Sequence, residues 1–527
     1  MAASHNGRLS DDILLMIFKL VCEEDQAALN DYLEKENVLI HSHWDDWGEE
    51  FIHGDYDQWK IDLADSLSAG NVDEPPPPST LSRAMSVCKH WYSLVSQTPS
   101  MWTVLEISFR EGAAALEHAR TFLQRGGSRL ISITLLWDDP AWIVPLCEEE
   151  IEGGLPPPSH EEMMAGVYLG SVIQELYAHV HRWREFTLRT TSFAHTRQAL
   201  LLMSRPSAHS ARGLEKLHLQ FVHNPRHAVH YISEPSLFPG STPPVRDLVI
   251  FGISWAWPSS AMLSANLVDL RIHYLSIMNE GNDDANHGSE EKILSQFLGT
   301  LVNLRTLALE VDLSSFTAET IELPRLHSLA IKSSTMSSWA VDFLHNVQMP
   351  ELRILTLCIN TEDFEEENVG DILDELVNLT DSDENPETPL ELDELHLFNF
   401  SRGVDVDTIR RLFTQMLTVE TLTLGPGAIN NVALAMGLLP TPHGGLAELP
   451  LSGIQTFILF DIPKYLIRQI VLERQSLAGP MEELYCRYRE GKEADDWQRH
   501  VEKFHRIDKL KSDRYTDVVA RRWSYLV

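Results

Sequence analysis

The chain is poor in cysteine. Cys22, Cys88, Cys147, Cys358 and Cys486 are scattered over 527 residues, and no two of them form a C-x-x-C pair. This usage fits a reduced, intracellular protein better than a disulfide framework or a cysteine-based metal site. We therefore expect the protein to be cytoplasmic, nuclear or both.

Basic residues and long apolar runs are also scarce. There are 42 Lys and Arg against 77 Asp and Glu, which gives a formal net charge of −35. A phosphate backbone or an anionic membrane surface would repel such a protein, so we expect no nucleic-acid partner and no membrane partner. The polar N-terminal stretch shows no secretory signal, and the most apolar run, residues 248–258, is shorter than the ~20 residues of a membrane span.

The motifs of common catalytic and cofactor sites are missing. The sequence GPGAIN at residues 425–430 lacks the lysine and the spacing of a phosphate-binding loop, and no G-x-S-x-G or H-E-x-x-H motif occurs. His41, His43 and His53 lie close together in sequence, but no second ligand motif accompanies them. We expect no catalytic residue, no metal, no cofactor and no enzymatic activity. An enzyme with a cleft between insertions remains an alternative, and a deep pocket with perturbed carboxylates or histidines would be its sign.

Two amphipathic segments stand near the N-terminus. Residues 9–21 predict a helix with Ser10 as its N-cap and a wide apolar face, formed by Ile13, Leu14, Ile17, Phe18 and Val21. Residues 81–95 predict a second helix, whose apolar face consists of Met85, Val87, Cys88, Trp91, Leu94 and Val95. Thr98 and Pro99 end that helix, and an extended run begins at Trp102. Cys88, on the apolar face, is expected to be buried and inert.

The stretch between these helices, about residues 22–78, is acidic and ends in four prolines, Pro75–Pro78. A proline run is stiff polyproline II and does not continue a helix. The composition predicts a solvated acidic insertion. An aromatic and acidic segment that grips a basic partner is the alternative.

Together the two helical segments resemble an F-box that is split by an insertion. The matching residues are Leu9, Asp12, Ile13, Leu14, Ile17, Phe18, Val87, Cys88, Lys89, Trp91, Thr98, Pro99 and Trp102. The Thr-Pro-x-x-Trp ending is common in fungal members of the F-box family. The chain departs from the family pattern at Ser10, where a proline is usual, and in the long insertion. An ordinary helical subdomain whose apolar residues pack only on each other is the alternative.

The resemblance implies a non-catalytic substrate receptor of a ubiquitin ligase. F-box proteins dock on the adaptor of a cullin–RING ligase and hold a target protein with the rest of the chain. On this resemblance the adaptor-binding residues are Leu9, Ile13, Leu14, Ile17, Phe18, Val87, Cys88 and Trp91. The implied partners are the adaptor, a cullin through the adaptor, and a target protein. A scaffold outside any ligase, with the N-terminal helices as a cap, remains the other interpretation.

Beyond residue 107 an apolar triplet at positions i, i+3 and i+5 recurs. It is clear at Leu214/Leu217/Leu219, Leu267/Leu270/Ile272, Leu304/Leu307/Leu309, Leu326/Leu329/Ile331, Leu352/Leu355/Leu357 and Leu392/Leu395/Leu397, and weaker at Leu130, Trp183, Val245, Val419 and Ile454. This is the L-x-x-L-x-L core of a leucine-rich repeat. Amphipathic segments at residues 291–301, 338–347, 370–379 and 406–417 predict helices that alternate with these strands.

These patterns predict an α/β chain in three parts. Residues 1–108 form the F-box, residues 109–462 form an irregular leucine-rich-repeat-like solenoid, and residues 463–527 form a helical C-terminal cap. The turn asparagine of regular repeats occurs only as Asn360, so other hydrogen bonds must satisfy most turns. Alternation along the strands predicts a target-binding face that includes Lys216, His218, Asp269, Arg271, Thr306, Glu394 and His396.

Overall fold

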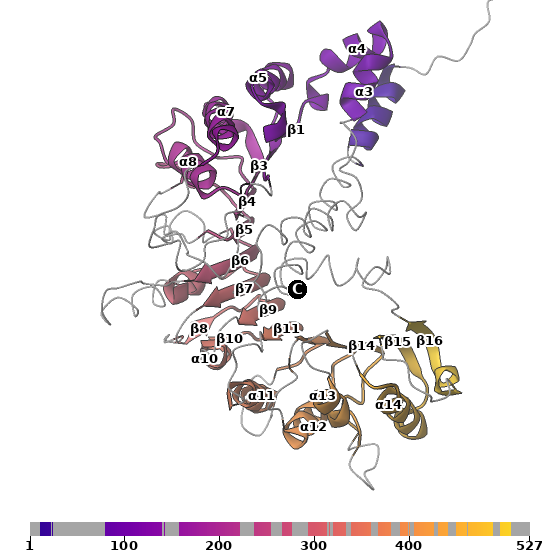
Figure 1. The fold of residues 1–527 in the computed structure, drawn as a ribbon. Helices are drawn as coiled ribbons and strands as arrows, with labels where there is room; N and C mark the ends of the chain where they lie inside the picture. Colours follow the sequence, from indigo (N-terminus) through magenta and orange to yellow (C-terminus); the bar gives the residue numbers. More distant parts are fainter. Residues whose placement is uncertain are drawn as a thin grey trace, which may run out of the picture. The chain divides into compact units, whose positions relative to one another are not determined.

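Figure 1 shows the computed structural model of the chain. The described residues are 11–22, 24, 80–139, 142, 158–221, 237–253, 266–276, 294–312, 316, 320–333, 339–359, 367–380, 390–398, 400, 405–425, 431–440, 449–460, 462–487 and 496–506. The chain divides into two compact units, with the boundary between residues 263 and 264. Leu9, Ser10, most of the acidic stretch at residues 22–78, Asn360 and the tail at 507–527 lie outside the described residues.

The first unit carries five parallel strands, and each strand pairs with the next one along the chain. The strands are β1 (Val104–Ser108), β2 (Ile131–Trp137), β3 (Trp183–Thr190), β4 (Lys216–Phe221) and β5 (Asp247–Phe251). The helical elements are residues 11–22, α3 (Thr80–Val87), α4 (Lys89–Ser96), η3 (Pro99–Met101), η4 (Phe109–Glu111), α5 (Ala114–Gly126), α7 (His160–Tyr177), η6 (Val180–Arg182) and α8 (Phe193–Met203).

The second unit is built in the same way, from nine parallel strands. They are β6 (Asp269–Ser276), β7 (Thr306–Asp312), β9 (Ser328–Ser333), β11 (Ile354–Ile359), β12 (Glu394–Phe398), β13 (Thr421–Leu424), β14 (Thr456–Phe460), β15 (Met481–Arg487) and β16 (Val501–Arg506). The helices are residues 294–299, α10 (Trp339–Asn346), α11 (Glu367–Thr380), α12 (Val406–Gln415), α13 (Val432–Gly437), α14 (Lys464–Leu477) and η9 (Asp496–His500). A two-stranded parallel sheet joins β8 (Ile321–Glu322) and β10 (Val347–Gln348).

The apolar triplets build the core of both units. The second and third residues of each triplet lie on the strands in register with those of the neighbouring strand, for example Leu355 beside Leu395 and Leu357 beside Leu397. From β4 onward, the clear triplets bury both of these residues to 2% exposure or less. Because side chains alternate across a strand, this register gives one face of the sheet to apolar residues and the other to the residues between them.

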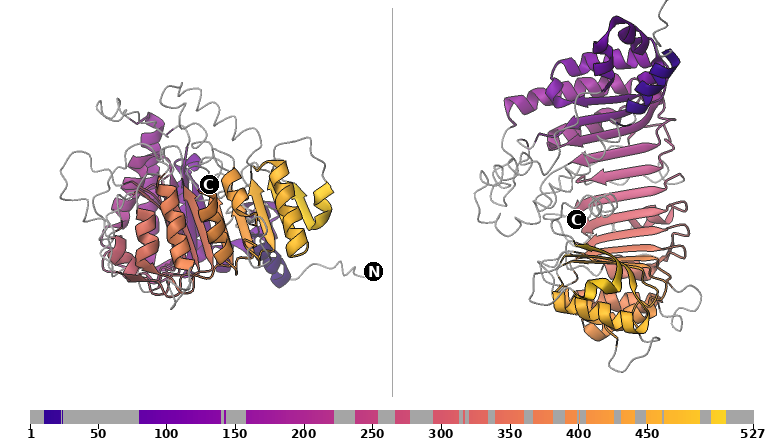
Figure 2. Two further views of the ribbon diagram at one scale, coloured as in Figure 1. Left: turned by 90° about the horizontal axis from the view of Figure 1, so that it is seen from below. Right: turned by 90° about the vertical axis from the view of Figure 1, so that its right-hand side faces the viewer.

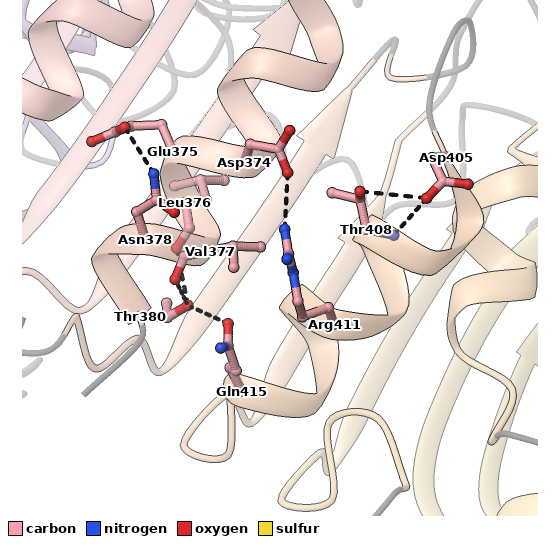
Figure 3. A network of polar contacts seen from close by, with 10 residues as sticks. All are labelled: Asp374, Glu375, Leu376, Val377, Asn378, Thr380, Asp405, Thr408, Arg411 and Gln415. Carbon is pink, nitrogen blue, oxygen red and sulfur yellow. Dashed lines mark hydrogen bonds and ion pairs between the residues drawn. The ribbon is translucent and has the colours of Figure 1, made fainter. Parts of the chain in front are cut away.

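Helices cover the apolar face. Figure 2 shows α11 to α14 side by side on one face of the strands of the second unit. Figure 3 shows how α11 and α12 are joined at their surface, where Arg411 donates to Asp374 at 3.0 Å and Thr380 lies 3.3 Å from Gln415. Asp405 caps α12 by accepting a hydrogen bond from the Thr408 backbone at 3.0 Å. No helix within the described ranges is long and apolar enough to cross a membrane.

The predicted α/β class and the alternation of helices with strands are confirmed. Each of the four amphipathic segments predicted beyond residue 290 contains a helix, at residues 294–299, 339–346, 367–380 and 406–415. The helical cap predicted over residues 463–527 is wrong for part of this region, because β15 occupies residues 481–487 and β16 occupies residues 501–506. These two strands extend the sheet of the second unit into the predicted cap. The three predicted domain boundaries stay predictions.

The single helix expected over residues 81–95 is also wrong. Cys88 has an extended backbone, with φ −162° and ψ 164°, and it divides the segment into α3 and α4. Its Sγ accepts a hydrogen bond from the Trp91 backbone at 3.5 Å, so the thiol serves as the N-cap of α4. Cys88 is consequently exposed and not buried on an apolar face.

Candidate functional site

The N-terminal helices pack on each other through two aromatic rings. Leu14 and Phe18 on helix 11–22 are buried. The ring of Phe18 meets that of Trp91 on α4 edge to face, with a centroid distance of 4.8 Å. Such a contact contributes about 0.5–1.5 kcal/mol beyond area burial. At the surface, His90 Nε2 lies 3.0 Å from Asp11 Oδ1.

The opposite side of helix 11–22 carries an apolar stripe, which consists of Ile13, Met16, Ile17 and Leu20. These residues recur at spacings of three and four and therefore share one face of the helix. Their exposed fractions are 40%, 58%, 39% and 54%. A row of four exposed large apolar side chains on one helix is the kind of surface that protein partners cover.

The end of α3 adds a further exposed apolar residue, Val87. The single apolar face predicted over residues 81–95 is not continuous in the structure. Met85 and Leu94 are half-buried, Val95 is fully buried, and Tyr92 is exposed. The break at Cys88 turns α4 relative to α3, so helical periodicity across the break does not describe one face.

The predicted adaptor-binding residues thus fall into two groups. Ile13, Ile17, Val87 and Cys88 are exposed, whereas Leu14, Phe18 and Trp91 hold the helices together. Met16 and Leu20 belong to the exposed stripe but were not among the predicted residues. Their spacing from Ile13, three and seven positions, was a signal that could have found them.

The N-terminal helices are joined to the first strand–helix unit through α5. Trp102 Nε1 donates to the carbonyl of Val95 at 2.9 Å, and the guanidinium of Arg125 lies 4.5 Å from the Trp102 ring. Arg125 Nη2 also donates to Tyr92 Oη at 3.3 Å. α4, η3 and α5 are therefore one packed assembly rather than a helical arm separated from the sheet.

The residues predicted to bind the target are divided between the two units. Lys216 and His218 lie on β4 in the first unit, and the other five lie in the second. Lys216 is exposed, and His218 is half-buried with Nε2 3.2 Å from Asp247 Oδ1. In the second unit Asp269 stands beside Thr306 in the register of β6 and β7, and both are half-buried.

His396 is not exposed as the alternation predicts. It is 4% exposed, and its Nδ1 lies 2.8 Å from Thr423 Oγ1 while its Nε2 lies 3.2 Å from Glu394 Oε2. The prediction is wrong here because residues in the middle of the strand face are buried as well as those that face the helices, as Thr356 and Thr423 also show. Arg271 and Glu394 are half-buried.

A search of the described parts of the chain addresses metal binding. Within them, no group of three or more His, Cys, Asp or Glu side chains could hold a metal ion. Scans against protein-family models and against curated proteins find no match to this chain. The apolar stripe and the polar strand face are therefore the surfaces on which a functional proposal can rest.

Proposed function

We propose that the chain is a substrate-recognition subunit of an adaptor–cullin–RING ubiquitin ligase. The apolar stripe of helix 11–22 would dock on the adaptor, and the remaining α/β part, as an irregular leucine-rich-repeat-like solenoid, would hold the target. The observation that carries the proposal is the exposed stripe at Ile13, Met16, Ile17 and Leu20 on a helix whose other face is fixed by the Phe18–Trp91 contact. Ubiquitin transfer would be carried out by other subunits, and this chain would supply proximity.

Variants of the stripe test the docking. Trp91 is not a suitable position for substitution, because its loss also removes the contact to Phe18. A loss of docking could then not be distinguished from a loss of folding. Met16→Asp combined with Leu20→Asp changes two outward residues at i and i+4. The matched control is Met163→Asp with Val167→Asp, two residues of α7 at the same spacing and with similar exposure, 50% and 57%.

Co-purification with the adaptor is the measurement. The Met16/Leu20 variant should lose the adaptor, because two buried charges at an apolar interface cost several kcal/mol. The Met163/Val167 variant should keep it. Retention of the adaptor by both variants would sink the docking claim, provided that circular dichroism shows native helix content.

The packing of α4 against α5 favours a second candidate. The hydrogen bond from Trp102 to Val95 and the Arg125 contacts are what a cap on the first strand would provide. A non-ligase interaction scaffold in which the N-terminal helices act as this cap would need no adaptor. Failure of the unaltered chain to co-purify with any cullin-associated adaptor favours the scaffold.

A further inference from the structure

The edge of the first unit where its strands begin carries a concentration of positive charge. Its exposed cations are Arg129, Arg184, Arg212, Lys216 and Arg246, and two exposed histidines, His181 and His209, stand among them. We call this set the basic rim. Because all five strands are parallel, the segments that precede β2, β3, β4 and β5 meet at one edge of the sheet.

Hydrogen bonds and a ring contact bring these segments together. The backbone N–H of Glu215 donates to the carbonyl of Arg184 at 2.7 Å, and that of Arg246 donates to the carbonyl of Glu215 at 2.7 Å. Nε of the buried Arg182 donates to the carbonyl of Arg129 at 3.0 Å. The rings of His181 and His209 lie 4.3 Å apart between centroids. The rim is thus a continuous surface across four strands.

A glycine permits the close approach of two of these segments. A Cβ on Gly213 would lie 3.0 Å from the carbonyl oxygen of Trp183 and 3.0 Å from Leu130. The loop that carries Arg212 therefore packs directly on the segments before β2 and β3. The backbone beside Arg212 is thereby fixed next to the carbonyl of Trp183, the residue that precedes Arg184.

Acidic residues on the rim leave an excess of positive charge. Glu185 Oε1 lies 3.3 Å from Arg184 Nε, and Asp247 lies 3.2 Å from His218. Glu215 is the third acid of this edge. With Glu175, which acts on the nearby His179, four carboxylates stand against five permanent cations among the described residues of this edge. The edge keeps a net positive charge although the chain has a net charge of −35.

Burial and neighbouring charged groups lower the pKa values of two histidines at this edge. Partial burial, the imidazoles of His209 and His179 and the Arg182 guanidinium together lower the pKa of His181. Burial and the charge of Arg182 likewise lower the pKa of His179, against an opposing influence of Glu175. An anion bound at the rim would raise the pKa values of these histidines, because it favours the protonated imidazoles.

We propose that the basic rim binds an acidic peptide segment, rich in Asp and Glu, of a partner protein. This deepens the proposed function, because the segment would belong to the target, and its biological meaning rests on that proposal. Peptide binding itself is measured without the adaptor, so either proposal can fail alone.

Two observations favour a peptide over nucleic acid. Among the described residues of the rim no exposed Phe, Tyr or Trp side chain offers a broad platform on which bases could stack, since Trp183 is fully buried. A long polyanion would also run from the rim onto a protein surface of strongly negative net charge. A short segment stays within about 8 Å of the cations, the distance over which physiological salt leaves their attraction effective.

The span of the rim sets the length of the probe. Four strands about 4.8 Å apart extend over roughly 14 Å, which about five extended residues can cover. A fluorescein-labelled peptide of about eight residues, composed of Asp, Glu and Ser, is therefore long enough. The same peptide with Asn and Gln in place of the acids is the uncharged control.

Charge-matched variants of the full chain provide the test. Arg129→Ala, Arg212→Ala and Arg246→Ala together remove three exposed cations from the rim. The control removes three exposed arginines elsewhere in the first unit, with Arg110→Ala, Arg120→Ala and Arg197→Ala. A third variant, with lysine at the three rim positions, keeps the charge. Both alanine triples change the net charge equally.

Fluorescence anisotropy should show salt-sensitive binding of the acidic peptide, weakened roughly tenfold by the rim triple, since three exposed charge pairs of about 0.5 kcal/mol each are lost. The control triple and the lysine triple should bind as the unaltered chain does. Equal weakening by both alanine triples, or equal binding of the uncharged peptide, would overturn the proposal. Tighter binding of a single-stranded oligonucleotide of equal charge would also overturn it, in favour of nucleic acid.

Discussion

His195 is the buried titratable side chain with the clearest consequence for stability. It lies on α8 with its ring 5.1 Å from that of Trp142, and its Nε2 donates to the carbonyl of Glu162 at 2.9 Å. Its Nδ1 has no hydrogen-bond partner among the described residues. Burial lowers the pKa of His195, and the hydrogen bond to Glu162 offsets this only in part.

This predicts a loss of stability in mild acid. Because the folded pKa lies below the unfolded value of about 6.5, the unfolded chain binds the proton more readily, and the free energy of unfolding falls as the pH drops below about 6.5. At pH 5.5 the loss due to this residue reaches at most about 1.4 kcal/mol. Urea unfolding at pH 7.5 and pH 5.5 measures it. His195→Gln keeps a donor for Glu162 and should show a smaller loss between the two pH values. An equal loss in both proteins would contradict the assignment.

Cys88 offers a second test at single-residue scale. Its thiol caps α4, and a serine hydroxyl is a stronger N-cap than a thiol. Cys88→Ser should therefore raise the free energy of unfolding by about 0.5–1 kcal/mol. Cys88→Ala removes the cap and serves as the comparison. A serine variant no more stable than the alanine variant in thermal unfolding would rule out the capping role.

At the scale of elements, Asn431 joins two neighbouring strands. It is buried at the start of α13, and its Nδ2 donates to the carbonyls of Gly425 and Phe460 at 2.8 and 2.9 Å. These carbonyls lie at the ends of β13 and β14. Asn431 thus donates to carbonyls at the ends of two strands, although it does not occupy the position at which a regular leucine-rich repeat has an asparagine.

Asn431→Ala should consequently destabilise the second unit. Two buried carbonyls lose their donor, which costs roughly 2–3 kcal/mol. Guanidinium unfolding measures the change. Asn378→Ala on the surface of α11 is a control, because the side chain of Asn378 is exposed and its hydrogen bond to Glu375 is long, 3.5 Å. A loss below about 0.5 kcal/mol at Asn431 would show that water replaces the amide.

The sequence predicted most strands but not the breaks between elements. Alternating leucines such as Leu395 and Leu397 are a local signal, and the strands follow it. β15 was missed although Met481, Leu484 and Cys486 have the same spacing, because a cysteine occupies the last leucine position. The break at Cys88 was missed because apolar periodicity continues across it. A backbone angle at one residue is not visible in such a pattern.

The candidate surfaces were predictable to different degrees. Ile13 and Ile17 were recognised, but the sequence could not show that Leu14 and Phe18 turn inward, since this depends on where Trp91 packs. The basic rim was not predicted at all. Its residues are far apart in sequence, and only the strand register places them at one edge.

At the scale of the whole molecule, net charge sets the response to salt. A formal charge of −35 makes the folded chain repel itself, and added salt screens this repulsion. The exposed ion pairs that salt weakens, such as Arg120–Glu175, contribute little in comparison.

Thermal stability should therefore increase between about 10 mM and 150 mM NaCl. If screening adds roughly 1 kcal/mol, the Tm of a chain of this length rises by about 1 °C. Differential scanning calorimetry at both salt concentrations measures the change, and a neutral osmolyte of equal osmolality is the control. A Tm that falls with salt would mean that specific ion pairs outweigh the general repulsion.

The strictly sequential strand order has a consequence for how this chain can change in evolution. From β12 to β15 each strand pairs with its predecessor and its successor along the chain. Duplication of one strand–helix segment would rebuild two junctions and leave every other pairing intact. The length of the surface offered to a partner can thus be altered by copying a segment of the gene, without a new fold.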